Sequence, residues 1–406
     1  DNMLKTAPRC CFWETVYADN RAKQEINTEY LLFFLACNGF AKIYEKKTKT
    51  DKYIRIKDFV VSEYQPKQIR NFIYNELKRR NIDNSIVNLF LNSKRTGSTL
   101  ADDLKIAELK FERNTQNSRS LFFENVALKI TADAITETRT SDISNYVWAD
   151  NICHHSYKKL EPAFEYSIDS QTGEINLQVK HIRSHYFRFL INSSRIFWRQ
   201  EFEERATSNA AVNEEYNQKY RFSIAGQRLT ATECQEQTRH LLNKMYAIGY
   251  ILHRYKRESN AMAVWIMENK LTEEDESSGG SGKSFMLRAL KKIGLINVAT
   301  INGREKKMTE NKHLLDRINS VTDLLQIDDA DRYFDFSYFY GMITGETIIN
   351  RKNIQSEELD FMESPVLAFT SNFPPPSDDR STLRRMLTVV FSDYYHEQGL
   401  DNVYRE

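Results

Sequence analysis

Residues 277–284 read Ser-Ser-Gly-Gly-Ser-Gly-Lys-Ser, and the fold of the last third of the chain is deduced from this stretch. It ends as the Walker A pattern GxxxxGKS/T ends, although Ser277 stands where that pattern has its first glycine. Such a loop turns backbone N–H groups inward around phosphate oxygens at the start of a helix. Lys283 would reach the outer phosphates and the Ser284 hydroxyl would bind Mg²⁺. A flexible Gly/Ser linker is the alternative, but few such linkers end in Gly-Lys-Ser. The expected phosphate cradle is Gly279, Gly280, Ser281, Gly282 and Lys283.

The residues around this loop alternate between apolar runs and helical stretches. The run 261–267 (AMAVWIM) is apolar throughout, as expected of a strand buried on both faces of a parallel sheet. A short helix is expected over 284–293. Further strands are expected at 321–327, 366–370 and 386–391. Strands that alternate with helices predict an α/β fold with a parallel sheet.

An acidic pair follows the second of these apolar runs. Residues 324–329 read LLQIDD, so Asp328 and Asp329 come at the end of a strand about 45 residues after Lys283. Two adjacent carboxylates are costly without a cation. Asp328 is therefore expected to hold the Mg²⁺ shell, and Asp329 to orient or deprotonate an attacking water. Taken alone, the pair would be interpreted as a polar turn after a strand, and its place in the α/β pattern favours the site.

Two polar features accompany the last two runs. Asn372 ends the run before Pro374, where an amide can lie beside a γ-phosphate, and an Asn-aromatic-Pro turn is the alternative. Arg384 and Arg385 come just before the final run. An arginine supplied across a subunit boundary can stabilise charge developing on a γ-phosphate. An arginine pair alone is more often solvated surface, and here the order of the motifs favours a functional role.

The first 260 residues have a different pattern. Strands are expected at 40–44, 53–61 and 120–130, and helices over 66–79 and 85–91. The pattern then becomes helical, most clearly over 241–257, while 201–218 is a solvated helix or a loop. Three parts are expected: a small α+β domain over 1–160, a helical collar or linker over 161–260, and an ATPase domain over 261–406.

The charge is unevenly distributed. Of the 406 residues, 41% are hydrophobic and 28% charged, so a packed core is feasible and global disorder is not expected. The net charge of +1 divides into +8 over 1–260 and −7 over 261–406. The first part is therefore the better partner for a polyanion such as DNA.

No membrane association is expected, because the longest apolar run, near 31–37, is far shorter than the roughly 20 residues of a spanning helix. Five cysteines without framework spacing predict a reducing compartment, and so a cytoplasmic location. The chain begins at Asp1 without a signal peptide, and we expect it to be a fragment of a longer protein.

In their order, these motifs resemble those of superfamily 3 helicases, the hexameric AAA+ type. The resemblance is greatest to the helicase part of phage, mobile-element and poxvirus-type primase-helicases. The matching strings cover roughly the last 145 residues: GGSGKS at 279–284, LLQIDD at 324–329, ITGETIINRKN at 343–353, SPVLAFTSNFP at 364–374 and STLRRMLTVVFSDYYH at 381–396. The helicase-flanking region is resembled more weakly at 121–131 and 144–152. The resemblance implies an AAA+ P-loop NTPase core that binds ATP and Mg²⁺ and assembles into a homo-oligomeric ring, a hexamer.

The resemblance also implies roles for single residues. Lys283 and Ser284 match the Walker A pair, Asp328 and Asp329 match the Walker B acids, and Asn372 matches the sensor asparagine.

Two further roles are implied. Residues 345–353 match the family's hairpin, whose basic tip, here Arg351 and Lys352, grips single-stranded DNA; an ordinary charged turn is the alternative. Arg384 or Arg385 matches the arginine finger. No primase centre is visible in 1–260. If the full protein is a primase-helicase, its primase part lies upstream of Asp1, and a C-terminal part is expected beyond the end of the chain.

Three functions are compatible with these motifs. The favoured one is an ATP-dependent, ring-forming helicase that translocates on single-stranded or forked DNA in phage or mobile-element replication, in the cytoplasm of a bacterial host. A primase or another replication protein is its possible partner. The second is an ATP-switched DNA-binding or origin-melting module without processive unwinding. The third, a small-molecule P-loop kinase, predicts a monomer and leaves Arg384 and Arg385 without a role in trans.

Overall fold

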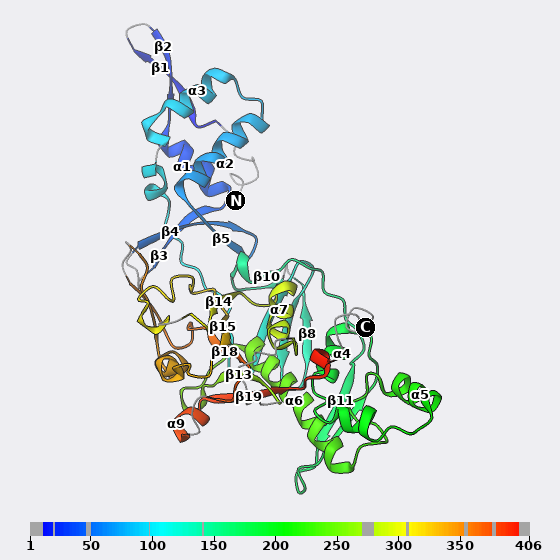
Figure 1. Cartoon of the computed structure of the whole chain (residues 1–406). Coiled ribbons are helices and arrows are strands. Elements are labelled where there is room, and N and C mark those ends of the chain that lie inside the picture. The colour runs from blue at the N-terminus through cyan, green and yellow to red at the C-terminus, as the bar shows by residue number, and fades with distance from the viewer. Residues whose placement is uncertain are drawn as a thin grey trace. The chain divides into compact units, whose positions relative to one another are not determined.

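The computed structural model describes residues 11–18, 21–45, 50–96, 98–139, 142–269, 280–305, 308–352, 356–375 and 379–397. It divides into two compact units (Figure 1). The first comprises Asp1–Arg113 and Ser120–Ile152, and the second comprises Asn114–Arg119 and Cys153–Glu406. Residues 161–260 fall in the second unit together with the parallel sheet. No helix among the described residues is long and apolar enough to cross a membrane.

The first unit combines short helices with mostly antiparallel strands, as the α+β pattern predicts, although β5 and β9 pair in parallel. One sheet has the order β3-β4-β5-β9 and another the order β10-β6-β7-β8. The strands are β1 (Trp13–Ala18), β2 (Arg21–Ile26), β3 (Phe40–Glu45), β4 (Thr50–Lys57), β5 (Val60–Tyr64), β6 (Ser118–Phe123), β7 (Ala127–Thr131), β8 (Ile135–Thr138), β9 (Val147–Trp148) and β10 (Ile152–Cys153). The helices are α1 (Thr28–Cys37), α2 (Pro66–Arg79) and α3 (Asn84–Asn92).

Two expected strands of this unit are each two strands in the structure. The run 53–61 is divided between β4 and β5, because Asp58 has a φ of 57° and reverses the chain. The run 120–130 is divided between β6 and β7 by a bend at 124–125. The alternation of apolar residues continues across a tight turn, so periodicity alone does not reveal the break. The helix over 66–79 is confirmed as α2, with Pro66 in its first turn.

A five-stranded parallel sheet forms the centre of the second unit, which confirms the α/β prediction. Its order is β14-β15-β18-β13-β19, and each neighbouring pair is parallel. The strands are β13 (Ala263–Glu268), β14 (Val298–Asn302), β15 (Leu324–Ala330), β18 (Val366–Ser371) and β19 (Met386–Phe391). The second expected strand begins at Leu324 rather than at 321, because Asn319 and Thr322 form a hydrogen-bonded turn before it.

Alternate side chains of β13 enter two different hydrophobic cores. Trp265 packs with Phe369 and the aromatic residues of 334–339, whereas Val264 and Ile266 pack with residues of α4 (His185–Asn192), α6 (Ala231–His253) and α7 (Lys283–Ile293). Both sets are fully buried. A run without polar alternation is therefore explained by burial on both faces.

Helix α6 lies against β19 at one edge of this sheet. Asn243 donates to the Thr388 carbonyl at 2.6 Å, and the fully buried Lys244 donates to the Val390 carbonyl. The helix begins earlier than the expected 241, because Thr230 and Glu233 form a capping box, and it ends at His253, because Arg254 adopts a left-handed conformation.

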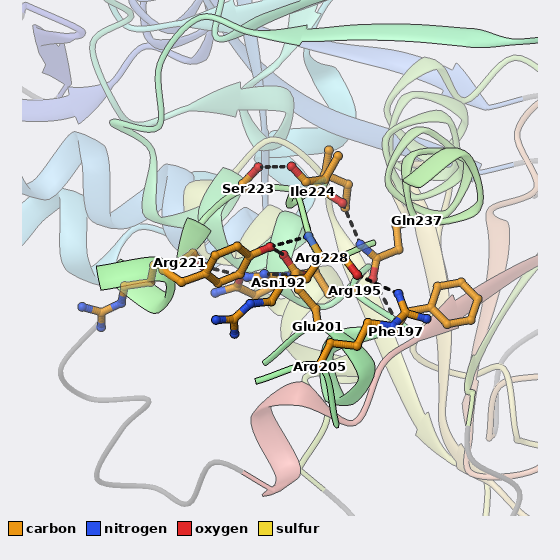
Figure 2. A network of polar contacts seen from close by, with 12 residues as sticks. Asn192, Arg195, Phe197, Glu201, Arg205, Arg221, Ser223, Ile224, Arg228 and Gln237 are labelled. Carbon is orange, nitrogen blue, oxygen red and sulfur yellow. Dashed lines mark hydrogen bonds and ion pairs between the residues drawn. The ribbon is translucent and has the colours of Figure 1, made fainter. Parts of the chain in front are cut away.

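The segment 201–218, left open between helix and loop, contains both. A π-helical turn at Gln200–Glu204 is followed by a loop and by α5 (Ala210–Tyr220). The turn is anchored by a buried ion pair between Arg195 and Glu201, with an N–O distance of 2.8 Å (Figure 2). Gln237 of α6 accepts from the Phe197 N–H and donates to the Ile224 carbonyl. This polar network ties the segment to α6.

Candidate functional site

The site predicted from the motifs lies at the carboxyl ends of three parallel strands. Strand β13 ends at Glu268, β15 carries the acidic pair just before its last residue Ala330, and β18 leads into Asn372. Ligands of open α/β sheets bind at this edge. Helix α7 begins at Lys283, with Gly282 as its N-cap at a φ of 91°. Gly279 lies outside the described residues.

Gly282 is held in a conformation and a space that only glycine fits. Its φ lies in the left-handed region, and a Cβ there would lie 2.5 Å from Cε2 of Phe189 on α4. Gly280 also has a positive φ, of 126°. Gly280 and Gly282 therefore have backbone conformations that favour glycine, and Phe189 of α4 packs against the chain at Gly282.

Lys283 lies among polar side chains at the strand ends. Its ammonium donates to Oδ1 of Asn372 at 2.7 Å, to Oγ of Ser281 at 3.2 Å and to Oε1 of Glu268. Burial lowers the pKa of Lys283, and the nearby carboxylates, Glu268 foremost, oppose that shift. The structure thus brings Lys283 and Asn372 together, 89 residues apart in the chain.

Ser284 and Asp328 are also in contact. The Ser284 hydroxyl donates to Oδ1 of Asp328 at 2.6 Å, and the Thr370 hydroxyl donates to the same oxygen at 2.7 Å. Burial works against ionisation of Asp328, but hydrogen bonds from Ser284, Thr370 and Gln326 and the charge of Arg288 together hold its pKa below the usual range. An ionised carboxylate beside a hydroxyl is a donor set suited to a hard cation such as Mg²⁺.

Asp329 points to a different partner from Asp328. The register of β15 against β18 shifts between Ile327 and Ala330, and Asp329 has a φ of 62°. A left-handed φ in a non-glycine residue costs about 1 kcal/mol or more and is concentrated at functional sites. The Asp329 carboxylate pairs with the guanidinium of Arg304 at 2.6 Å, and both side chains are about half exposed. The bulge therefore separates the two carboxylates.

The two candidate finger arginines differ in their surroundings. Arg385 donates to the carbonyl and the hydroxyl of Ser381, at 2.9 and 2.7 Å, and its guanidinium lies over the Tyr340 ring. Arg384 is exposed, after α9 (Arg380–Leu383). Of the two arginines, Arg384 is therefore the one whose side chain is open to solvent.

The expected hairpin is present as β16 (Thr347–Ile349) and β17 (Glu357–Leu359), which pair antiparallel. Arg351 forms an ion pair with Glu357 and donates to the Ile318 carbonyl at 2.6 Å. Lys352 is exposed. The sequence pattern predicts hairpin strands at Thr347–Asn350 and Ile354–Glu357, whereas the second strand begins at Glu357, and residues 353–355 lie outside the described residues.

Some residues at the site are absent from the motif-based prediction. They are Glu268, Arg288, Arg304 and Thr370. A carboxylate that directly follows the apolar run 261–267 was a signal for Glu268, because an acid at the end of a buried strand needs a partner. Arg304 follows β14, a strand that the sequence analysis did not identify.

Comparisons with known proteins do not identify a family. No protein-family model and no curated protein matches the chain. Among solved structures, it is similar to the A-form apo structure of the NrS-1 C-terminal region, with 14% identity, a TM-score of 0.41, and coverage of 91% of this chain and 63% of that one. A second A-form apo structure of that region has 12% identity, a TM-score of 0.26, and coverage of 69% and 62%. The chain thus spans less than two thirds of either structure.

Proposed function

We propose that the second unit is a P-loop NTPase that binds Mg²⁺·ATP at the carboxyl edge of its sheet and hydrolyses it. The observation that carries the proposal is the convergence of two pairs, Lys283 with Asn372 and Ser284 with Asp328, from the start of α7 and the carboxyl ends of β15 and β18. A flexible linker or an ordinary polar turn would not be expected to bring an ammonium, an amide, a hydroxyl and a carboxylate into contact. The strand that leads to Asn372 lies between the strands that lead to Lys283 and Asp328.

Each residue has a role that follows from its chemistry. Backbone N–H groups near Gly280–Gly282 and the Lys283 ammonium would bind phosphate oxygens, while Ser284 and Asp328 would hold Mg²⁺. Bound Mg²⁺ would neutralise charge on the phosphates. Asp329 would orient the attacking water after exchanging its contact with Arg304, and Asn372 would lie beside the γ-phosphate.

We further propose that hydrolysis drives a ring-forming DNA helicase of the superfamily 3, AAA+ type. The motif order, the exposed Arg384 and the β16–β17 hairpin support this proposal. Arg384 would reach the site of a neighbouring subunit, and Lys352 would contact the phosphate backbone of single-stranded DNA. Such contacts are independent of sequence and sensitive to salt. The same site residues would serve an ATP-switched DNA-binding module, so turnover distinguishes the two functions.

The test is ATP hydrolysis and strand displacement on forked DNA, measured for the wild type and for Lys283→Ala and Asp329→Asn. A helicase requires DNA-stimulated hydrolysis and displacement that both variants lose, while Asp329→Asn still binds ATP. If Asp329→Asn keeps the DNA-dependent function without hydrolysis, the protein is an ATP-switched DNA-binding module and not a helicase. If the wild type binds no nucleotide, the NTPase proposal is wrong.

A further inference from the structure

Glu268 is a buried carboxylate in direct contact with the candidate phosphate loop. It is the last residue of β13 and is only 4% exposed. Its Oε1 accepts from the Ser281 hydroxyl at 2.8 Å and from the Lys283 ammonium. One oxygen therefore receives donors from two loop residues that the sequence assigns to phosphate binding.

The ammonium of Lys283 has three protons to donate, and all three have acceptors. These acceptors are Glu268, Ser281 and Asn372. A phosphate oxygen can bind Nζ only by taking the place of one of them. Of these three acceptors, only Glu268 carries a carboxyl group. When ionised, this carboxylate competes with a phosphate for Lys283 and also repels the phosphate at short range. Coulombic repulsion is strong where water is excluded, as it is around a side chain buried to this degree.

We propose that Glu268 is a positioning residue that competes with nucleotide phosphates for Lys283 and thereby weakens nucleotide binding. The proposal rests on the proposed NTPase function. Glu268 stabilises the free protein by pairing a buried ammonium, and the same contact opposes the triphosphate. Ligand affinity falls when a competing internal contact must first be exchanged.

The decisive variant is Glu268→Gln, which keeps the size of the side chain and removes the charge. Its affinity for the non-hydrolysable analogue AMP-PNP with Mg²⁺, measured by calorimetry, is expected to be about tenfold higher than that of the wild type, the size of a typical coupling between linked equilibria. Its melting temperature without ligand is expected to fall, because Lys283 loses its counter-ion. The rise in melting temperature on adding the analogue is expected to be larger than in the wild type.

The charge of the ligand separates competition from a merely structural role. The gain in affinity is expected to be larger for AMP-PNP than for AMP, which lacks the outer phosphates that Lys283 would bind. A structural role predicts weaker binding of both ligands in proportion. Glu258→Gln, which neutralises an exposed glutamate of the same unit, is the matched control and is expected to leave both affinities unchanged.

The outcomes are distinguishable from failure of the proposed function. If the wild type binds AMP-PNP and Glu268→Gln binds it equally or more weakly, Glu268 does not compete with the nucleotide for Lys283. The NTPase proposal is unaffected by that outcome. If neither the wild type nor Glu268→Gln binds, both proposals are wrong. If circular dichroism shows that Glu268→Gln does not fold, Glu268→Asp replaces it as the test variant. Its shorter side chain moves the carboxylate away from Lys283. Tighter binding by Glu268→Asp supports competition, and unchanged or weaker binding overturns it.

Discussion

At the scale of single residues, the candidate site depends on side chains that satisfy one another. Lys283, Ser284 and Asp329 each contact an oppositely charged or hydrogen-bonding group within the site. Arg384 and Arg385 are adjacent in sequence, yet only Arg385 is bound within its own unit. The two adjacent side chains therefore differ in how accessible they are to solvent.

We expect Arg384→Ala to lose at least about 100-fold in ATP hydrolysis without a change in melting temperature, as for removal of a finger that acts in trans. Arg385→Ala is expected to lower the melting temperature instead, because it loses two hydrogen bonds to Ser381 and the contact with Tyr340.

Mixing Lys283→Ala and Arg384→Ala proteins provides the control for a role in trans. Mixed rings contain interfaces in which an intact Lys283 meets an intact Arg384, so hydrolysis is expected to recover in part. No recovery in mixtures shown to exchange subunits contradicts the assignment of Arg384.

At the scale of elements, the two basic residues of the β16–β17 hairpin differ: Arg351 is held by contacts within the protein, and Lys352 is exposed. Arg351 joins the hairpin to Glu357 and to the Ile318 carbonyl, and His313 contacts the Asn350 carbonyl through Nδ1 at 2.9 Å. The two basic residues expected at one tip thus have different surroundings.

We expect Lys352→Ala to weaken single-stranded DNA binding and to reduce strand displacement, with basal ATP hydrolysis unchanged. The slope of log affinity against log salt is expected to become shallower by about one for each hairpin that loses its phosphate contact. Fluorescence anisotropy at several salt concentrations measures it. Wild-type displacement by the Arg351→Ala/Lys352→Ala double variant would contradict the hairpin assignment.

Helix α6 introduces a pH dependence through Lys244. Burial lowers the pKa of Lys244 to about 7, and burial together with the charge of Arg254 lowers that of Lys256 to about 7. Between pH 7 and the unfolded-state value near 10.4, the unfolded chain binds more protons than the folded one. The free energy of unfolding therefore rises with pH over this range, and below pH 7 the contribution is constant.

We expect Lys244→Met to reduce that rise by on the order of 2–4 kcal/mol. Lys256 remains and maintains part of the rise. Urea unfolding followed by tryptophan fluorescence at pH 7.0 and 9.5 measures the difference. The exposed Lys159 is the control, and Lys159→Met is expected to keep the wild-type slope. An unchanged slope in Lys244→Met would show that Lys244 does not titrate in this range.

At the scale of the whole molecule, two features suggest binding partners: the uneven distribution of charge along the chain and the exposed side chain of Arg384. The +8 of residues 1–260 favours a polyanion, and Arg384 needs a second subunit if it acts in trans. We expect the protein mass of the particle in solution, measured by light scattering and corrected for bound DNA, to increase to a multiple of 47.8 kDa when AMP-PNP, Mg²⁺ and forked DNA are added. A protein that stays monomeric under all these conditions would contradict the proposal that Arg384 acts at the ATP site of a neighbouring subunit.

The sequence by itself determined the parallel sheet and the identity of most site residues. Apolar runs at 261–267, 366–370 and 386–391 correspond to β13, β18 and β19, because a strand buried on both faces needs no polar alternation. The spacing of the Gly-Lys-Ser end and the acidic pair also predicted that Lys283 and Asp328 would come to one edge. These predictions depend on local pattern and on chain order, which are visible in sequence.

Only the tertiary structure decided which groups contact one another. Glu268 meets Lys283 across 15 residues, and Arg304 meets Asp329 across 25, because the carboxyl ends of parallel strands converge. The left-handed φ of Asp329 arises from a bulge in the pairing of β15 with β18, which no local pattern encodes. The sequence therefore predicted most residues of the candidate site, while long-range packing added Glu268, Arg304 and Thr370 and decided which groups are partners.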